Sequence, residues 1–545
     1  MAKLNKPKTA QTSNLREHKD ATVNEEGGLA FKMDAKSELF TRVLTALVGE
    51  PQFYDETGEK KDKAILELVG KMAKEDPEFV LQLAAYARNE MNLRSIPQVL
   101  LVEATGFPET KAFVRKWTPS IIRRADELTE VVAYYQTRFG HIGNKAKKGM
   151  LCNPLKRGMA TAFHQFDAYA LAKYDRDGPV KMKDVLKVVH PKPRDEEQAR
   201  MWGMLKDRTL PPPATWEVEL STKGSSKESW ERIIPKMNYM GLIRNLRGFV
   251  QKGVDLKPVL KRLTDPEEVK RSKQLPFRFY SAFNALENVS EVRASQKVMD
   301  AMQTALELSV ENLPELGGVT CIMADTSGSM KSPMSKMSNV QMYQVACLMG
   351  AMVQKSCDEA VVGVFADRWA VVKLSKADGI LTNMEKLMGH NVGGSTNAWL
   401  GMEWLNKNRE KVDRIILLSD QQCYSTSGGY NAYTGGGYGS RGESLAEQFE
   451  EYKAKVSPKC VLHSVDLAGH GTSQFPKDDG SVVLLAGFSE RIFEFVSRYE
   501  TGKGDAISAI KTTKPRELRV PKTWFPKAKK EEAADEHEEE PGTAG

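Results

Sequence analysis

The sequence predicts an α + α/β fold, in which a helical-repeat module is followed by a doubly wound, mostly parallel-sheet domain. The chain has 545 residues, which is too many for one hydrophobic core. Apolar residues recur at helical spacing up to about residue 308, whereas short β-branched runs alternate with helix-length segments after residue 315. This change of pattern predicts a domain boundary near residues 310–316.

We expect four segments along the chain. A polar, Lys-rich stretch over residues 1–34 predicts a flexible N-terminal arm. The helical-repeat module is expected at residues 35–312 and the sheet domain at 313–512. A C-terminal segment follows at 513–545, and seven acids without Lys or Arg over residues 531–545 predict that it ends in a disordered acidic tail.

Apolar residues in the first half are spaced as on one face of successive short helices. The groups are separated by Pro51 and Pro77. Short helices that are each apolar on one side are typical of stacked helical pairs of the solenoid type. The residues are Leu39, Phe40, Val43, Leu44, Leu47, Ile65, Leu68, Val69, Met72, Phe79, Val80, Leu83, Ala84 and Ala87.

Six short runs predict the strands of the second half. Helix-length segments lie between most of them, and strand–helix alternation is typical of a parallel sheet with helices on both faces. The runs are Val319–Ala324, Ala360–Ala366, Ala370–Leu374, Arg414–Ser419, Cys460–Asp466 and Val482–Ala486.

The composition excludes several classes of protein. A hydrophobic share of 41% and a charged share of 28% describe an ordinary globular protein, and the chain has no apolar run of membrane-spanning length. Residues 1–34 lack the apolar core of a signal peptide, so we expect a cytoplasmic location. The six cysteines form no CxxC pair and the eight histidines no HExxH motif, which disfavours zinc sites and disulfides.

Positive charge is concentrated in one part of the chain. The net charge is +7, and because residues 531–545 hold seven acids and no bases, residues 1–530 carry +14. Residues 141–194 contain twelve Lys or Arg against four acids. A basic body of this kind suits a polyanionic partner.

A helix predicted from Leu155 indicates which face of the chain carries part of this positive charge. Leu155, Met159, Phe163, Phe166 and Ala170 form an apolar stripe. The positions opposite the stripe, toward solvent, are those of Arg157 and His164. Together with the loop that holds Lys145, Lys147 and Lys148, this face can follow phosphates without reading bases. A solvated helix face with ordinary surface histidines remains the alternative.

Polar side chains at three places in the second half predict an oxygen-ligand site. Asp325 ends a predicted strand and is followed by Ser327 and Ser329, while Asp420 ends another strand. A hydroxyl is also available from the Gly-Gly-Ser-Thr sequence at 393–396. Carboxylate and hydroxyl oxygens match Mg²⁺ or Mn²⁺ better than zinc. An ordinary polar loop or helix cap is the alternative reading of each motif alone.

These motifs resemble the metal-ion-dependent adhesion site of von Willebrand factor A domains, in which Asp-x-Ser-x-Ser is followed by Thr and then Asp. The resemblance implies that the second half is such a domain. Two features depart from the pattern: Asn397 stands where relatives often have an acid, and a Gly/Tyr-rich stretch over 425–440 could cover or extend the site. The choice of Thr396 over Ser395 as a ligand is a matter of alignment. The implied ligands are Asp325, Ser327, Ser329, Thr396 and Asp420.

The first half resembles the TROVE module of Ro ribonucleoproteins. In that family a helical module precedes an A domain, and the likeness here covers roughly residues 35–510. It implies a ring of HEAT-like repeats closed by the A domain, with small structured Y RNAs on the outer surface and ends of misfolded RNAs in the basic hole. The matching segments are Ala170–Tyr174, Val189–Pro193, Trp230–Pro235, Gly241–Leu246 and Leu275–Phe279.

The resemblance also implies particular RNA contacts. Lys173 and His190 match RNA-contacting positions of the family. Asp177 stands at a position that is basic in relatives, with Arg176 beside it, which puts the details of Y RNA binding in question. The full set of expected RNA-binding residues is Lys145, Lys147, Lys148, Lys156, Arg157, His164, Lys173, Arg176 and His190.

Three classes of function follow from these motifs. The leading hypothesis is a non-enzymatic, monomeric RNA-binding protein that acts in RNA quality control or as an RNA-tethered scaffold. The alternative is a protein–protein scaffold whose metal site captures an acidic residue of a partner, for which an exoribonuclease is one candidate. A metal-dependent phosphoryl-transfer enzyme is disfavoured, because the loop after Asp325 supplies only hydroxyls and the chain has no Walker sequence.

Overall fold

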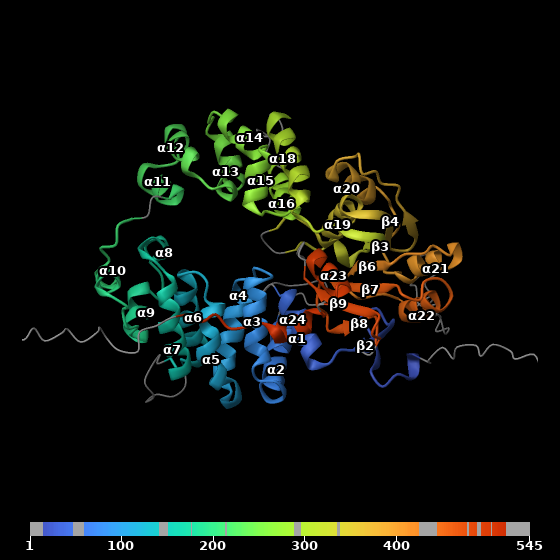
Figure 1. Cartoon of the computed structure of the whole chain (residues 1–545), viewed down its shortest axis with the longest axis horizontal. Helices are drawn as coiled ribbons and strands as arrows, with labels where there is room; N and C mark the ends of the chain where they lie inside the picture. Colours follow the sequence, from blue (N-terminus) through green and yellow to red (C-terminus); the bar gives the residue numbers. More distant parts are fainter. Residues whose placement is uncertain are drawn as a thin grey trace, which may run out of the picture.

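The computed structural model describes residues 15–46, 59–140, 151–175, 177–212, 215–287, 296–334, 338–424, 444–476, 479–487, 492–502 and 504–518. Its fold is the expected one, with a helical half followed by a domain built on a mostly parallel sheet. Figure 1 shows the helices along an arc that begins and ends at the sheet domain, so that the chain forms a ring.

The first part of the arc consists of helices that pack in succession. Contacts join α1 to α2, α3 to α4 and to α5, and α5 to α7. The side chains of α3 are buried over most of its length, because neighbouring helices cover it on more than one side. The helices are α1 (Ala35–Leu44), α2 (Glu59–Glu75), α3 (Phe79–Asn89), α4 (Ser95–Glu103), η2 (Ala104–Gly106), α5 (Pro108–Ile121), α6 (Asp126–Phe139) and α7 (Asn153–Ala162).

The second part of the arc consists of shorter helices. Several start at an Asp, Asn or Ser whose side chain accepts a hydrogen bond from the first turn, as Asp167, Asp195 and Asn238 do. The helices are η3 (Phe163–Gln165), α8 (Ala168–Tyr174), α9 (Met182–Val189), α10 (Glu196–Asp207), α11 (Trp216–Lys223), α12 (Lys227–Ile233), η4 (Ile234–Lys236), α13 (Tyr239–Gln251), α14 (Lys257–Leu263), α15 (Pro266–Ser272), α16 (Pro276–Glu287), α18 (Gln296–Ser309) and η5 (Val310–Asn312).

The sheet of the second half has the strand order β5-β4-β3-β6-β7-β9. All its pairings are parallel except that of β5, which lies antiparallel at the edge. Each of the six predicted strands overlaps one of these. The strands are β3 (Leu316–Asp325), β4 (Cys357–Phe365), β5 (Trp369–Val371), β6 (Arg414–Ser419), β7 (Val461–Asp466) and β9 (Val482–Ala486).

Helices cover both faces of this sheet. Along β3, Ile322 and Ala324 pack into the core that continues into the helical half, whereas Cys321 and Met323 pack into a second core on the other face. The first core includes residues of α19, α20, α23 and α24, and the second includes residues of α21 and α22. The helices are η6 (Ser329–Lys331), α19 (Met342–Ser356), α20 (Ile380–Met388), α21 (Trp399–Asn408), α22 (Leu445–Lys455), α23 (Ile492–Glu500) and α24 (Ala506–Thr512).

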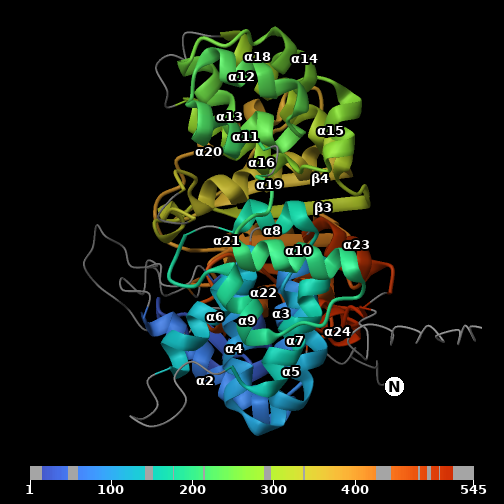
Figure 2. The ribbon, with the colours of Figure 1, turned by 90° about the vertical axis from the view of Figure 1, so that its left-hand side faces the viewer.

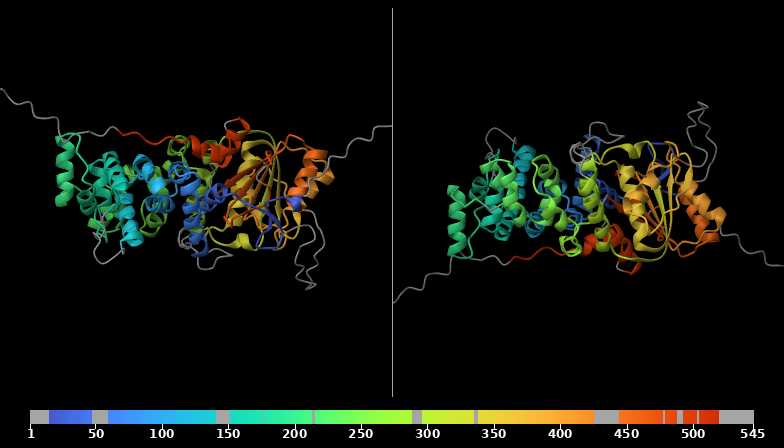
Figure 3. Two further views of the ribbon diagram at one scale, coloured as in Figure 1. Left: turned by 90° about the horizontal axis from the view of Figure 1, so that it is seen from below. Right: turned by 90° about the horizontal axis from the view of Figure 1, so that it is seen from above.

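The sheet domain contacts both ends of the helical arc. At one end α1 contacts β9 and α3 contacts α24, and at the other end α18 contacts α20. Figure 2 shows α16 and α18 above the sheet domain and α2 and α5 below it. After α24 the chain runs along one side of the helical half toward α7, as the edge-on views of Figure 3 show.

The prediction of a flexible arm up to residue 34 is wrong for residues 15–34. After η1 (Leu15–Glu17), β1 (Ala21–Val23) pairs with β2 (Leu29–Lys32), and β2 pairs with β8 (Thr472–Ser473) of the sheet domain. The stretch is polar in sequence, but Phe31 and Leu15 are buried against the second core of the sheet domain. Its order therefore comes from a partner more than 400 residues away in sequence.

Two other expectations concern the helical half and the membrane. The predicted helix from Leu155 does not continue to Ala170, because α7 ends at Ala162 and a 3₁₀ turn, η3, precedes α8. No helix in the described ranges has the length and apolar character needed to cross a membrane. The tail at 531–545 and the Gly/Tyr-rich stretch at 425–440 lie outside the described residues.

Candidate nucleic-acid interface and candidate metal site

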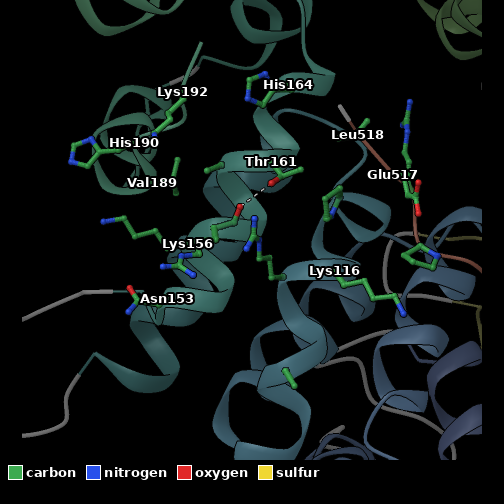
Figure 4. A pocket seen from close by; sticks show the side chains of 17 residues that line it. Lys116, Asn153, Lys156, Thr161, His164, Val189, His190, Lys192, Glu517 and Leu518 are labelled. Carbon is green, nitrogen blue, oxygen red and sulfur yellow. Dashed lines mark hydrogen bonds between the residues drawn. The ribbon is translucent and has the colours of Figure 1, made fainter. Parts of the chain in front are cut away.

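A cationic depression lies on the helical half. It has a volume of about 1140 Å³ and is formed by α5, α7, the residues after α9 and the segment at 515–518 (Figure 4). We call it the basic pocket. Six of its lining residues are cations and one, Glu517, is an acid. The cations are Arg115, Lys116, Lys156, Arg157, Lys192 and Arg516.

A glycine brings two of these elements together. At Gly158 of α7, an added Cβ would lie 2.5 Å from Thr118 Oγ1 of α5 and 3.2 Å from the Arg115 carbonyl oxygen. Only a residue without a side chain fits at this crossing. The close approach places Arg115 on α5 and Arg157 on α7 in the same pocket.

Most of this charge is not neutralised by neighbouring acids. Among the described residues, no carboxylate forms an ion pair with Arg115, Lys156, Arg157 or Lys192. Lys116 pairs with Glu78 at 2.9 Å. A cluster of cations without partners has a favourable interaction with phosphates, because no internal salt bridge must first be broken.

The C-terminal segment is fixed to the wall of the pocket by Arg516. Its amide donates a hydrogen bond to Ser120 Oγ (2.7 Å) and its Nη1 to Gln165 Oε1 (2.7 Å). Arg516 is 351 residues from Gln165 in sequence. The pocket is therefore built from parts of the chain that sequence spacing does not relate.

The structure brings four of the predicted RNA-binding residues together. Lys156, Arg157, His164 and His190 all line the basic pocket, and Figure 4 shows Lys156 and His190 on neighbouring elements. His190 is exposed and ends α9 in the left-handed conformation, with φ of 47°. Three other predicted residues, Lys145, Lys147 and Lys148, lie outside the described part of the chain, as does Arg176.

Lys173 is placed apart from this group. It lies on α8, where its Nζ is 3.8 Å from Glu217 Oε1, and it does not line the basic pocket. Nearby, Asp177 forms ion pairs with Lys181 (3.2 Å) and Arg208 (3.1 Å), and these two cations lower the pKa of its carboxyl. Asp177 therefore pairs with Lys181 and Arg208, whose positive charges would otherwise be available to an RNA.

The expected solvent-facing position of His164 is wrong. The side chain is 7% exposed, and its ring lies 5.2 Å from that of Trp202 in an edge-to-face contact. The chain turns out of helix α7 into η3 before this residue, so the helical-wheel position no longer applies. Burial lowers the pKa of His164 to about 4, with a further contribution from the charge of Arg194, so the imidazole is neutral at pH 7.

The predicted metal residues meet at one edge of the sheet. Asp325 is the last residue of β3, and Asp420 directly follows the adjacent parallel strand β6. In the sheet, β4 lies on one side of β3 and β6 lies on the other. The strand order therefore reverses at β3, and open α/β sheets bind ligands at the carboxyl ends of the strands next to such a reversal. Both carboxylates are fully buried, and Ser327, Ser329 and Thr396 are at most 5% exposed.

Hydrogen bonds orient the first of these carboxylates. The Ser327 amide donates to Asp325 Oδ1 at 2.9 Å, and the Ser419 hydroxyl donates to Asp325 Oδ2 at 2.7 Å. The Ser327 and Ser329 hydroxyls share a hydrogen bond of 3.3 Å. These hydrogen bonds hold the Ser327 and Ser329 hydroxyls close together in the loop that follows Asp325, and a hard cation requires oxygen ligands gathered in this way.

The carboxylate of Asp420 indicates whether a cation fits between the predicted metal residues. Asp420 Oδ2 is buried and has no hydrogen-bond partner in the part of the chain that the structure describes. Burial raises the pKa of Asp325, as does the charge of Asp420, and burial also raises the pKa of Asp420. Two buried acids without a counter-charge are costly, so Asp325, Asp420, Ser327, Ser329 and Thr396 fit Mg²⁺ or Mn²⁺.

Only two of the five residues of the candidate metal site carry a formal charge. No group of three or more His, Cys, Asp or Glu side chains within the described ranges could hold a metal ion. The candidate site therefore depends on hydroxyl oxygens in addition to its two carboxylates. Nitrogen and sulfur ligands of the kind that zinc prefers are not gathered in this part of the structure.

The loop that carries Thr396 is held from both sides. Asp367, after β4, accepts a hydrogen bond from the Ser395 amide (2.8 Å), and the Gly328 amide donates to the Gly394 carbonyl (2.8 Å). The Tyr424 amide donates to the Thr396 carbonyl, also at 2.8 Å. These contacts fix the loop next to the Asp325–Ser329 loop.

Comparisons with known proteins agree with both halves of this architecture. The TROVE domain family matches residues 10–208 and 204–361, and the Ro60 vWA domain family matches residues 320–500. This chain belongs to the TROVE-domain family of Ro proteins. The helices of the basic pocket accordingly lie in the TROVE module, the segment at 515–518 follows the matched A domain, and the candidate metal site lies in the Ro60-type A domain.

Individual relatives are distant. The chain is 24% identical over 339 residues to telomerase protein component 1 of Mus musculus, which covers 47% of this chain and 13% of that protein. It is 24% identical over 294 residues to the RNA-binding protein RO60 of Caenorhabditis elegans, which covers 52% of this chain and 43% of that protein. The chain therefore spans less than half the length of either relative.

The fold is shared with a protein of known structure. The crystal structure of the Ro (RSR) protein of Deinococcus radiodurans matches with a TM-score of 0.61 and 18% sequence identity. The match covers 86% of this chain and all of that protein. It shows that the two molecules share the arrangement of a helical half and an A domain.

Several residues of the two sites were not predicted from the sequence. Arg115, Lys116 and Arg516 complete the basic pocket, but they lie outside the basic stretch at 141–194. Lys192 lies within that stretch and within the matching segment Val189–Pro193, but it was not among the expected RNA-binding residues. In the A domain Asp367 positions the Thr396 loop without belonging to the adhesion-site pattern. Only its place directly after a predicted strand could have indicated it.

Proposed function

We propose that this chain is a non-enzymatic RNA-binding protein whose TROVE module holds RNA phosphates in the basic pocket. The observation that carries the proposal is the gathering of Arg115, Lys156, Arg157 and Lys192 around one depression, where none of them forms an ion pair with an acid of the described ranges. Membership of a family that includes a relative named RNA-binding protein RO60 supports it.

The pocket favours recognition of a backbone over recognition of bases. Lys and Arg side chains bind phosphate oxygens, and each phosphate that they neutralise releases condensed counterions. Affinity should therefore fall steeply as salt rises. The exposed His190 and the half-buried Thr161 add hydrogen-bonding groups at the same surface.

The ligands that we propose are small structured RNAs of the Y type and misfolded RNAs with free 3′ ends, and the role is RNA quality control or RNA tethering. The pocket is a depression and not an enclosed cavity, so an end or a bend of an RNA can enter without threading. Because Asp177 pairs with Lys181 and Arg208, we expect the region around α8 to contribute less than the basic pocket.

A binding experiment with matched variants tests this proposal. Filter binding of a small hairpin RNA with a single-stranded 3′ end is compared for the wild type, Lys156→Glu/Arg157→Glu and the control Lys407→Glu/Lys455→Glu, whose lysines are exposed in the A domain. We expect the pocket variant to lose at least about tenfold in affinity and to show a shallower salt dependence. The control and Asp325→Ala should bind as the wild type does.

Two outcomes would contradict the proposal. One is equal affinity of the two double variants, because both change the net charge equally. The other is competition by heparin as effective as competition by unlabelled RNA, which would indicate an unspecific polyanion site.

A second candidate function concerns the A domain. Asp420 Oδ2, which is buried and accepts no hydrogen bond from the residues that the structure describes, supports a site for Mg²⁺ or Mn²⁺. A cation held by few charges can accept an acidic group from another protein. We propose this capture of a protein partner, for which an exoribonuclease is one candidate, as the alternative role. It is compatible with RNA binding, because the candidate metal residues and the lining of the basic pocket have no residue in common.

A further inference from the structure

A second depression adjoins the basic pocket at His164. It has a volume of about 500 Å³ and lies between η3, the start of α8 and the start of α10. We call it the acidic depression. His164 lines both depressions, and Figure 4 shows it at the end of the basic pocket opposite Asn153. An RNA strand that leaves the basic pocket at this end therefore meets the acidic depression next.

The two depressions differ in charge. Three carboxylates line the acidic depression, those of Asp167, Asp195 and Glu197, against the single guanidinium of Arg194. Within the described ranges, no ion pair joins these three acids to a cation. A phosphate is thus attracted to the basic pocket and repelled by the acidic depression. The part of a nucleotide that suits the acidic depression is its uncharged base.

An exposed aromatic ring lines the acidic depression. Tyr169, near the start of α8, is 49% exposed, whereas among the described residues the other exposed large apolar side chains are the aliphatic Val23 and Val371. Contact of an aromatic ring with water is unfavourable, and a base stacked on the ring would relieve it. Proteins hold unpaired bases in this way, by stacking them on aromatic side chains.

Two polar side chains of the acidic depression are available for hydrogen bonds. Glu197 is exposed and forms no hydrogen bond or ion pair with the described residues. His164 is 7% exposed, and neither of its ring nitrogens has a hydrogen-bond partner of normal geometry in the same part of the chain. A carboxylate accepts a hydrogen bond from the exocyclic amino group of a base, as in the recognition of cytosine. The acidic depression therefore offers a stacking surface together with an acceptor.

We propose that the acidic depression binds one unpaired base of the RNA whose phosphates lie in the basic pocket, and that this base stacks on Tyr169. The inference rests on the RNA binding proposed above and adds a base subsite to it. The base carries an exocyclic amino group that donates to Glu197, so adenine, cytosine or guanine binds there in preference to uracil. Helix α8 then contributes stacking, although Asp177 reduces its contribution to phosphate binding.

Filter binding of a hairpin RNA with a single-stranded 3′ end of cytosines tests the subsite. Tyr169→Ala removes the ring, whereas the control Tyr169→Phe removes only the hydroxyl. Loss of one base–aromatic stack weakens binding about fivefold or more, so we expect this loss for Tyr169→Ala and wild-type affinity for Tyr169→Phe. The salt dependence should stay that of the wild type, because no phosphate contact is lost. Lys156→Glu/Arg157→Glu, by contrast, should make it shallower.

A series of RNAs identifies the bound base. Each nucleotide of the 3′ end is made abasic in turn, and binding to the wild type should weaken at one position. The same abasic RNA should cause no further loss in Tyr169→Ala, because the two changes remove one interaction. Uracil at that position should bind the wild type more weakly than cytosine does, but it should bind Glu197→Ala equally well. Glu197→Ala preserves the test if Tyr169→Ala unfolds.

The outcomes separate the base subsite from RNA binding itself. Wild-type affinity of Tyr169→Ala, or a loss in Tyr169→Ala that is the same for every abasic RNA, would overturn the base subsite alone. A loss accompanied by a shallower salt dependence would also overturn it, since Tyr169 would then act through phosphate contacts. A wild type that binds no RNA would overturn the proposed function and this inference together.

Discussion

The burial and the role of a single residue in this protein depend on its surroundings more than on its residue type. His164 is a histidine in a basic stretch, yet it is buried against Trp202. Arg157, seven residues earlier on α7, is exposed and has no acidic partner among the described side chains. Two residues with the same sequence-based expectation therefore have different roles, one in the core and one at the surface.

The burial of His164 has a consequence for stability. Its pKa is lowered to about 4 in the folded chain, against about 6.5 for an unperturbed histidine, so the unfolded chain binds more protons between these values. The contribution of this residue to stability is therefore fully present above pH 6.5 and is lost as the pH falls toward 4. Urea unfolding at several pH values should show a smaller loss over this window for His164→Gln. An equal loss in both proteins would mean that His164 does not titrate in this way.

At the scale of elements, the close packing of α5 on α7 builds the basic pocket. The helices approach at Gly158, where a side chain would meet Thr118 and the Arg115 carbonyl. In the A domain, parallel pairing of β3 with β6 similarly brings Asp325 and Asp420 to one edge. In both cases the site follows from which elements are neighbours.

A pair of glycine substitutions tests the α5–α7 crossing. Gly158→Ala forces the two helices apart and should cost about 1–3 kcal/mol of stability, together with a loss of RNA affinity. Gly203→Ala is the matched control, because it lies inside α10 with no atom within 4 Å of an added Cβ and should stabilise the protein by up to about 1 kcal/mol. Thermal unfolding distinguishes the two. A Gly158→Ala protein that is as stable as Gly203→Ala would show that the crossing tolerates a side chain.

At the scale of the whole molecule, the A domain closes the ring by contacts with both ends of the helical arc. One of these contacts is made by Arg42 of α1, whose Nη1 and Nη2 donate to the carbonyls of Gly469 (3.3 Å) and His470 (3.2 Å). Glu38 holds the guanidinium in place at 2.8 Å. The arc and the A domain are therefore joined by directional bonds as well as by apolar packing.

Removal of this contact should loosen the ring at one side. Arg42→Ala loses two charged hydrogen bonds to carbonyls, and we expect a cost of about 1–3 kcal/mol in the free energy of unfolding. Lys63→Ala on α2, whose side chain is exposed, is the control with the same change of charge. Hydrogen exchange should increase in α1 and in residues around 469–473 of the Arg42 variant. Unchanged exchange there would place the closure of the ring elsewhere.

The sequence by itself determined the two architectures, the six strands of the main sheet, and the place of Asp325 and Asp420 at strand ends, because each depends on local periodicity or on a motif next to a strand. The tertiary structure alone decided the composition of the basic pocket, the burial of His164 and the acidic depression beside it. These depend on contacts such as Arg516 with Gln165, which are 351 positions apart, or His164 with Trp202. Local spacing carries no information on such contacts, because they arise only when the ring brings distant elements together.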